Sequence, residues 1–169
     1  MDKIISNATP LIYLAKSDKL TLLQNIINQV LIPKAVFREV VVEGKRLGEK
    51  DAYRVEKAIG QGWLRVEEVK NMFLTKVSLH PGEIEVISLA KEKGIKTVLM
   101  DDAKGRSVAE LAGLKPVGTL WIFLQAVKNR IIDFDEFLST VEDIIHAGFY
   151  FKNEIYIKVI RTAKIISEE

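Results

Sequence analysis

The sequence contains no cysteine and only two histidines, His80 and His146. The lack of cysteine excludes disulfide bonds and thiolate metal sites, and it fits a reducing compartment, so we expect a cytoplasmic location. Two histidines are too few for a His-rich zinc site. No uncharged apolar run reaches about 18 residues, so the sequence predicts no membrane-spanning helix and no membrane partner. Asp, Glu and Asn oxygens remain as candidate metal ligands.

The net charge is small, because 25 Lys and Arg residues nearly balance 23 Asp and Glu residues. The charges are unevenly distributed: residues 1–132 carry 21 basic and 15 acidic side chains, whereas residues 133–169 carry 4 and 8. A mildly basic body with an acidic tail suits a polyanionic partner, and an ordinary solvated surface explains the same numbers equally well. Composition alone therefore does not decide the partner.

Short apolar runs alternate with stretches of helical periodicity over residues 1–132. This pattern is typical of buried parallel strands joined by crossover helices, so the predicted fold class is α/β, a parallel sheet with helices on both faces. We expect Thr9 to cap the first helix, with Pro10 at its first position. The strands are expected at residues 3–6, 29–32, 63–66, 97–101 and 115–117.

Residues 133–169 have a different character, with two amphipathic helices expected over 134–146 and 154–166. The sequence therefore predicts two parts: an α/β domain over 1–132 and a C-terminal helical extension over 133–169 packed on it. Any apolar surface of these two helices that the body leaves uncovered would serve as a docking surface or as the interface of a homodimer.

Polar side chains directly follow two of the predicted strands. Asn7 comes after the first strand, and Asp101 and Asp102 come after the fourth. Ligands of such sheets bind where the carboxyl ends of the strands meet the helix starts. Glu83, in the turn that opens a helix, and Glu39, if its helix turns it inward, would add two carboxylates. Oxygen ligands of this kind select Mg²⁺ or Mn²⁺ and predict metal-assisted hydrolysis of phosphodiesters.

These residues also have ordinary structural explanations. Glu83 can complement the dipole of its own helix, Glu39 can lie on a solvated helix face, and Asn7 can serve a turn. The adjacent acids Asp101 and Asp102 are the strongest candidates, because like charges side by side cost free energy unless solvent or a cation screens them.

Three segments, IISNATPLI, PGEIEVISLAKEKGIKTVLMDDAKGRSVAELAG and HAGFYFKNEIY, together resemble the stand-alone PIN-like proteins of bacteria and archaea, relatives of VapC toxins. The resemblance covers nearly the whole chain. It implies a Mg²⁺- or Mn²⁺-dependent endoribonuclease that acts on RNA, homologous to the toxin of a toxin–antitoxin pair, with an antitoxin-like protein partner. It assigns the metal to Asn7, Glu39, Glu83 and Asp102, and catalysis to the last three.

The resemblance leaves the register open at two places. The acid after the fourth strand is Asp102 or Asp101, and the acid of the helix is Glu83 or, as in flap endonucleases, Glu85. Thr9 matches a small hydroxyl position beside the first ligand, and we expect it to contact the substrate. Lys104 and Arg106 follow the acids at a helix start, where they would bind a phosphate together with the helix amides, or would be ordinary surface charge.

This chain departs from the family pattern in two positions. Asn7 stands where active PIN nucleases have Asp, and Lys104 stands where they often have a second acid. An amide oxygen ligates a hard cation but adds no negative charge. A unit charge pair at about 4 Å is worth roughly 4 kcal/mol at an effective dielectric constant of about 20, before desolvation reduces it. We therefore expect weak metal binding.

Three functions follow, in decreasing order of support. The first is a slow PIN-type ribonuclease that hydrolyses RNA. The second is a catalytically weak PIN-like module that binds RNA or a protein. The third is a phosphatase-like α/β domain that uses Asp101 and Asp102, and it ranks last because its nucleophile should lie near the first strand, where the chain offers only Asn7.

Overall fold

The computed structural model describes residues 2–169 and contains one five-stranded sheet with the strand order β3-β2-β1-β4-β5. All four pairings are parallel, and Ile5 in the central strand pairs with Leu31 on one side and Val98 on the other. The strands are β1 (Lys3–Ser6), β2 (Gln29–Pro33), β3 (Leu64–Glu67), β4 (Thr97–Leu99) and β5 (Lys115–Val117). The predicted α/β fold class is therefore confirmed.

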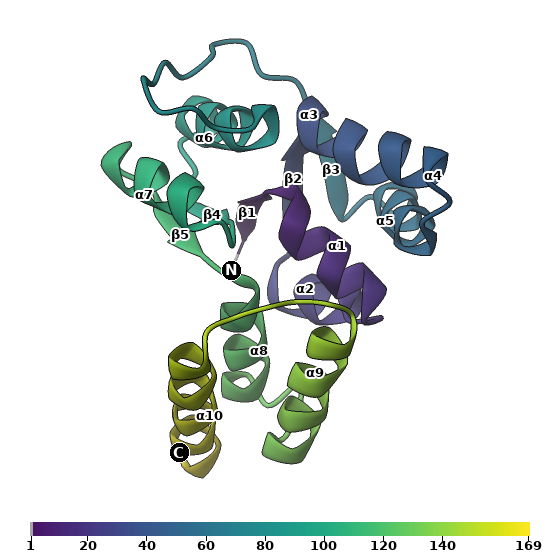
Figure 1. Ribbon diagram of the computed structural model, residues 1–169, viewed down its shortest axis with the longest axis vertical. Helices are drawn as coiled ribbons and strands as arrows, with labels where there is room; N and C mark the ends of the chain where they lie inside the picture. Colours follow the sequence, from purple (N-terminus) through teal and green to yellow (C-terminus); the bar gives the residue numbers. More distant parts are fainter. Residues whose placement is uncertain (1) are drawn as a thin grey trace.

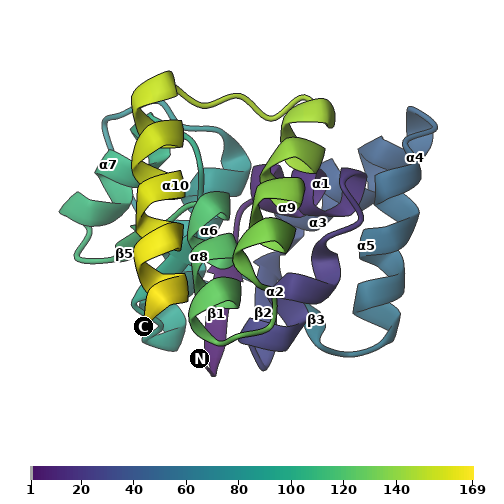
Figure 2. The ribbon, with the colours of Figure 1, turned by 90° about the horizontal axis from the view of Figure 1, so that it is seen from below.

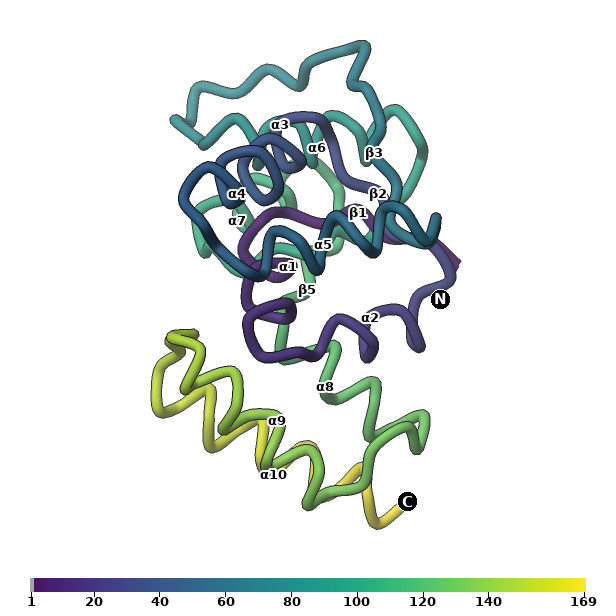
Figure 3. Tube along the Cα trace, turned by 90° about the vertical axis from the view of Figure 1, so that its right-hand side faces the viewer, coloured from purple at the N-terminus to yellow at the C-terminus, as the bar shows by residue number. Residues whose placement is uncertain are grey.

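Helices connect the strands and cover both faces of the sheet (Figures 1 and 3). In Figure 3, α3 and α6 lie above β1 and β2, and α1, α2 and α5 lie below them. The helices are α1 (Ala8–Lys16), α2 (Leu20–Ile26), α3 (Lys34–Phe37), the π-helical turn η1 (Arg38–Glu43), α4 (Gly44–Arg46), α5 (Lys50–Gly60), α6 (Pro81–Lys93), α7 (Ala103–Leu111), α8 (Thr119–Lys128), α9 (Phe134–His146) and α10 (Asn153–Glu168).

The strands β1, β2 and β4 are buried on both faces, which explains why they appear in the sequence as apolar runs, whereas the edge strand β3 carries the exposed Arg65. Ile4, Ile5 and Ser6 of β1 are all fully buried, as are Val98 and Leu99 of β4. Because β1 is central, the chain first builds the sheet outward through β2 and β3, and then returns to add β4 and β5 on the other side of β1. The reversal between β1 and β4 is the position at which such sheets bind ligands.

The predicted cap of the first helix is wrong. The first helix begins at Ala8, so Asn7 rather than Thr9 occupies the N-cap position, and the Asn7 side chain makes no capping hydrogen bond. Pro10 consequently lies at the third helical position, where its missing N–H is still harmless because the first turn has no carbonyl partner for it. The helix α1 ends at Lys16, and Asp18, which adopts a left-handed backbone (φ 58°), lies between α1 and α2.

The helices α8, α9 and α10 form a lobe below the α/β body (Figure 1), in which α10 packs against α8 and α9. We call these three helices the helical lobe. The helix expected over 134–146 has those bounds, and the last helix runs from Asn153 to Glu168. The division of the chain at residue 133 stays a prediction, and α8, which precedes it, lies with the two later helices in space. No helix within residues 2–169 is long and apolar enough to cross a membrane.

Candidate active-site cleft

A cleft of about 630 Å³ opens at the carboxyl edge of the sheet, where β1, β2 and β4 lead into helices. The starts of α1, α3, α6 and α7 surround it, because each parallel strand of this sheet delivers its following helix to the same edge. Five residues that the sequence singled out line the cleft together with residues that it did not. The lining consists of Asn7, Thr9, Ala35, Arg38, Glu39, His80, Pro81, Gly82, Glu83 and Asp102.

Because Gly82 has no side chain, two side-chain oxygens of the cleft lining approach the first turn of α6. A Cβ atom on Gly82 would lie 3.2 Å from Asn7 Oδ1 and 3.4 Å from Glu39 Oε2. The Asn7 backbone is anchored between the strands, because its N–H donates to the Leu99 carbonyl at 2.8 Å. The amide of Asn7 and the carboxylate of Glu39 therefore face the same point from two different helices.

Glu83 lines the cleft and also stabilises the start of its own helix. Its Oε2 accepts a hydrogen bond from the His80 N–H at 2.8 Å, and its Oε1 lies 2.8 Å from where a Cβ on Gly105 would be. Its side chain is buried. The sequence presents helix stabilisation and a position in the cleft as alternatives for Glu83. In the structure, Glu83 has both roles.

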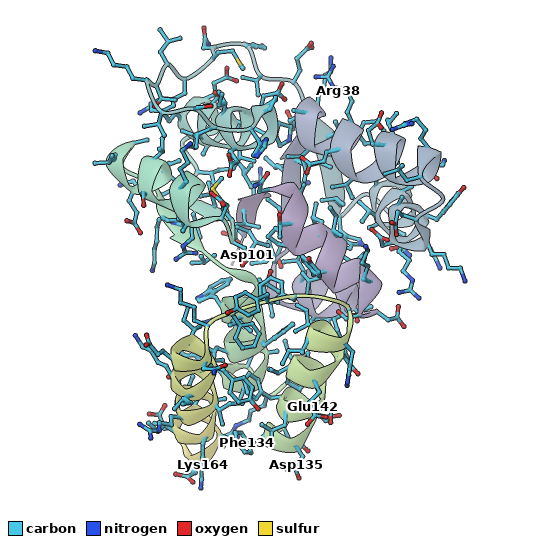
Figure 4. The ribbon with its side chains drawn as sticks, in the orientation of Figure 1. Arg38, Asp101, Phe134, Asp135, Glu142 and Lys164 are labelled. Carbon is cyan, nitrogen blue, oxygen red and sulfur yellow. The ribbon has the colours of Figure 1, made fainter. Side chains whose placement is uncertain are left out.

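The adjacent acids after β4 point to different places. Asp102 lines the cleft and caps α7, with its Oδ1 accepting hydrogen bonds from the N–H groups of Lys104 and Gly105, both at 2.9 Å. Asp101 instead caps α8, because its carboxylate accepts from the Thr119 N–H at 2.8 Å and from the Thr119 hydroxyl at 2.6 Å. Figure 4 shows Asp101 near the junction between the α/β body and the helical lobe. Asp102 is thus the acid of this pair that faces the cleft.

Burial controls the ionisation of Asp101. Removal of its carboxyl from water raises the pKa of Asp101, while the hydrogen bonds from Thr119 and the positive charge of Arg106 act in the opposite direction. The net effect is a raised pKa, so the neutral form of Asp101 is favoured more than the neutral form of an exposed Asp would be.

Glu85 lies outside the cleft lining and connects α6 to α3. Its Oε2 accepts a hydrogen bond from the Ala35 N–H at 2.8 Å, and its Oε1 lies 3.8 Å from Arg38 Nη2. The N-cap of α3 is Pro33, which has no polar side chain to bind the first amides of the helix. Glu85 provides that acceptor from a neighbouring helix, so of the two acids in the GEIE segment Glu83 is the one in the cleft.

The two cations expected to bind substrate do not line the cleft. Arg106 Nη1 donates to the Met100 carbonyl at 3.0 Å, so its guanidinium points into the β4–α7 connection rather than into the cleft. Lys104 is exposed at the start of α7. Arg38 and His80 line the cleft instead, and neither was predicted from the sequence. The sequence offered one signal for each: Arg38 directly precedes Glu39, and His80 directly precedes Pro81, where α6 begins.

Glu39 and Glu83 share the cleft with His80, and this affects the ionisation of Glu39. Partial burial raises the pKa of Glu39, the nearby imidazole of His80 opposes the shift, and the negative charge of Glu83 adds to it. A positive charge bound in the cleft would therefore stabilise the ionised form of Glu39.

A family model described as a PIN domain matches residues 3–165 of the chain. The chain belongs to the PIN-domain family. The suspected PIN resemblance is thereby confirmed, and the match includes the helical lobe up to residue 165. PIN domains have a nuclease-type fold, generally depend on divalent metal ions, and bind nucleic acid.

The other comparisons add little to this assignment. The comparison with curated proteins gave no match. One similar solved structure is described as a domain of a functionally unknown protein from Methanocaldococcus jannaschii DSM 2661. It is 16% identical in sequence, with a TM-score of 0.48, and the alignment covers 70% of this chain and 91% of that one.

The cleft of this PIN domain has donor atoms of the kind that a divalent cation prefers, but these donors are not grouped closely enough to hold one. Its donors are amide and carboxylate oxygens, which hard cations prefer. Within residues 2–169, however, no three His, Asp or Glu side chains lie close enough together to hold a metal ion. One oxygen each of Glu83 and Asp102 is already bonded to backbone N–H groups. The point shared by Asn7 and Glu39 beside Gly82 is the best-formed part of the site.

Proposed function

We propose that this PIN domain is a slow endoribonuclease that hydrolyses RNA phosphodiester bonds with Mg²⁺ or Mn²⁺. The observation that carries the proposal is that Asn7, Glu39, Glu83 and Asp102, which are far apart in the sequence, all line one cleft at the switch point of the sheet. Membership of a family with a nuclease-type fold supports the same reaction class.

In this proposal the chain's own residues bind and orient the substrate around the metal-binding oxygens. Asn7 and Glu39 would hold the ion beside Gly82, with Glu83 and Asp102 completing the site. A bound divalent ion would activate a water molecule and neutralise charge on the leaving oxygen. Arg38, which is exposed in the lining, would bind an RNA phosphate through its guanidinium, and Thr9 would contact the same strand.

The proposed reaction is slow for two reasons. The Asn7 amide contributes no negative charge, so the site attracts a cation less strongly than a site with Asp in that position. Glu83 and Asp102 must also divide their oxygens between the cleft and the helix amides that they already bind.

A second candidate function is a module that binds RNA or a protein without turnover. The lack of a three-acid group within residues 2–169 favours it, because weak metal binding would leave the cleft without the charge needed for hydrolysis. An antitoxin-like partner and a cytoplasmic location remain predictions under either function.

Mn²⁺ titration by calorimetry, together with cleavage of a mixed pool of single-stranded RNA, tests the first function. We expect weak Mn²⁺ binding and slow cleavage that EDTA abolishes. Asp102→Asn should remove cleavage and leave the fold intact, since Asn is as good an N-cap as Asp. Asn7→Asp should bind Mn²⁺ about ten-fold more tightly, because even about 1.4 kcal/mol of the added attraction has that effect.

The matched control is Glu110→Gln, which removes a carboxylate from the exposed face of α7 and should leave both Mn²⁺ affinity and cleavage unchanged. Cleavage that persists in Asp102→Asn would show that the nuclease activity comes from elsewhere. Failure of both wild type and Asn7→Asp to bind Mn²⁺ would leave the binding module as the function.

A further inference from the structure

A second cavity, of about 280 Å³, lies beside α1, α2 and α5 on the face of the sheet that these helices cover (Figures 2 and 3). Its described lining residues are all different from those of the active-site cleft. The ends of α1 and α5 border it, and because crossover helices run back from the carboxyl edge of a parallel sheet, these ends lie toward the opposite edge. We call it the Trp63 pocket, and its lining includes Thr21, Gln24, Arg54, Lys57, Gln61 and Trp63.

The buried part of the Trp63 pocket is apolar. Its lining there consists of Ala15, Leu20, Ala58 and Trp63, each at most 9% exposed. The indole N–H of Trp63 donates to the Gln61 side-chain oxygen at 3.2 Å, so the polar atom of the ring already has a partner. The indole and the aliphatic side chains therefore offer a ligand apolar contact area, which suits a planar ring.

The exposed part of the pocket lining is polar. Thr21 and Gln24 are exposed on α2, and Lys57 is exposed on α5. Within residues 2–169, the side chains of these three residues make no hydrogen bond and no ion pair. A hydroxyl, a carboxamide and an ammonium group are thus available to a ligand without breaking a contact of the folded chain.

Arg54 adds a second positive charge, and the fold fixes its position. Its Nη1 donates to the Ala15 carbonyl and lies 3.7 Å from Asp18 Oδ1, so the guanidinium joins α5 to the end of α1. A guanidinium has five N–H donors, and those on the other two nitrogens remain for a ligand. The Asp18 carboxylate offsets one of the two positive charges, which leaves the pocket net positive and favours an anionic ligand.

These features together describe a small ligand with a planar ring and one anionic group, and a nucleoside monophosphate has both. Its base has an apolar face for Trp63 and a hydrogen-bonding edge for the Gln24 carboxamide, which both donates and accepts. Its phosphate suits Arg54 and Lys57, because hydrogen bonds between cationic groups and phosphate are strong. The volume, just below the roughly 300–1,000 Å³ of drug-sized ligand sites, matches one nucleotide rather than an RNA strand.

We propose that the Trp63 pocket binds one nucleoside monophosphate, with the base in contact with Trp63 and Leu20 and the phosphate held by Arg54 and Lys57. This is a second binding site, at the opposite edge of the sheet from the cleft in which RNA cleavage is proposed. It needs neither a metal ion nor RNA cleavage, so its failure and that of the proposed function are separate results.

Fluorescence of Trp63 is the first test, because a tryptophan in the pocket reports a ligand that contacts it. The chain has one other tryptophan, Trp121, which Trp121→Phe removes. AMP, GMP, CMP and UMP are titrated separately into this variant in EDTA. At least one should change the Trp63 emission saturably, with a dissociation constant below about 1 mM. No saturable change with any of the four at about 10 mM would overturn the proposal.

Ribose 5-phosphate tests whether the base contributes. It carries the sugar and the phosphate but no base, so it should bind at least about ten-fold more weakly than the best nucleotide, since contact between a base and an aromatic side chain has an effect of that size. Equal affinities would reduce the pocket to an anion site and would overturn the assignment of the base to Trp63.

Variants in the Trp121→Phe background test the polar contacts. Lys57→Glu reverses the charge of the exposed cation in the pocket and should raise the dissociation constant at least about ten-fold. Gln24→Ala removes the free carboxamide and should raise it about five-fold. The matched control is Lys50→Glu, which makes the same charge change on the exposed first turn of α5, outside the lining, and should leave the affinity unchanged. All three positions are exposed, so the variants should fold.

Two results of these titrations would contradict the assignment to this pocket. A Lys57→Glu variant that binds the nucleotide as tightly as Lys50→Glu would overturn the proposal. A calorimetric heat of binding without any change in Trp63 emission would overturn it too, because the nucleotide would then bind elsewhere on the protein.

Discussion

At the scale of single residues, the cleft is made of side chains that also hold the fold together. Glu83 binds the amide that opens α6, and Asp102 caps α7, while both face the same space. Asp101, directly before Asp102, points to the other side and caps α8. Because Asp101 has a separate partner, it adds no further repulsion to the three carboxylates that line the cleft, which are Glu39, Glu83 and Asp102.

The burial of Asp101 predicts how stability depends on pH. Because the pKa of Asp101 in the folded protein is raised above its ordinary value of 3.8, its contribution to stability is fully present below that value and is lost as the pH rises through the folded pKa. The side chain introduced by Asp101→Asn cannot titrate. We therefore expect the difference in Tm between wild type and Asp101→Asn to shift in favour of the variant from acid to neutral pH.

Thermal unfolding of both proteins across this range, in EDTA, measures the effect. Glu110→Gln, which removes an exposed carboxylate, serves as the reference for loss of charge alone. A difference between wild type and Asp101→Asn that stays constant with pH would mean that Asp101 keeps its ordinary pKa in the folded protein.

At the scale of elements, the geometry of the cleft depends on how α6 docks on α3. Gly82 allows close contact, since a Cβ there would lie 3.4 Å from both Glu39 Oε2 and Val36 Cγ2. Glu85 then binds the Ala35 amide at the start of α3. The continuation of α3 into the π-helical turn η1 carries Glu39 into the cleft, and π-helical turns are frequent at functional sites.

Removal of the Glu85 carboxylate should destabilise the protein by leaving α3 without its acceptor. We expect Glu85→Ala to lower the free energy of unfolding by about 1–2 kcal/mol, the usual cost of losing a helix cap. Glu85→Gln should cost less, because its amide oxygen still accepts the hydrogen bond from Ala35. Urea denaturation measures both values, and equal losses in the two variants would assign the stabilisation to the ion pair with Arg38.

At the scale of the whole molecule, the helical lobe packs on the α/β body, with α8 against α2 and α9 against α1, and its buried side chains continue the core of the body. The α9–α10 connection carries Phe149, whose ring meets the Tyr13 ring of α1 edge to face, with centroids 5.1 Å apart. Lys19, just before α2, pairs with Asp143 of α9 at 3.0 Å. The cap of α8 by Asp101 joins the lobe directly to the strand end that also carries Asp102.

Truncation of Phe149 should loosen this attachment. Phe149 is 9% exposed, so we expect Phe149→Ala to cost about 3 kcal/mol, at the low end for a buried Phe. Hydrogen exchange should rise more in α9 and α10 than in the strands, because the packing of Phe149 on Tyr13 holds the lobe against the body. Tyr150→Ala, one residue further and 86% exposed, should change stability by no more than about 0.5 kcal/mol. If hydrogen exchange in Phe149→Ala instead became faster by the same factor throughout the chain, the α/β body and the helical lobe would unfold together.

The sequence was a good guide wherever a local rule decides the outcome. All five strands were predicted to within one or two residues, and β1, β2 and β4 were recognisable as apolar runs because strands buried on both faces have few polar positions. Gly94 ends α6 in a left-handed conformation, as expected from a glycine at that position. The rules for capping were less decisive, since Asn7 and Thr9 are both acceptable at a helix start.

The sequence by itself determined the α/β class, the alternation of strands and helices, and the oxygen-bearing residues at the strand and helix ends, because these follow from local periodicity and backbone chemistry. Only the tertiary structure decided which acid of each pair faces the cleft, that Arg106 turns away from it while Arg38 and His80 line it, and that α8 packs with α10 and α9 in one lobe. Those facts depend on the relative placement of distant segments, which packing and long-range hydrogen bonds set and which no local pattern encodes.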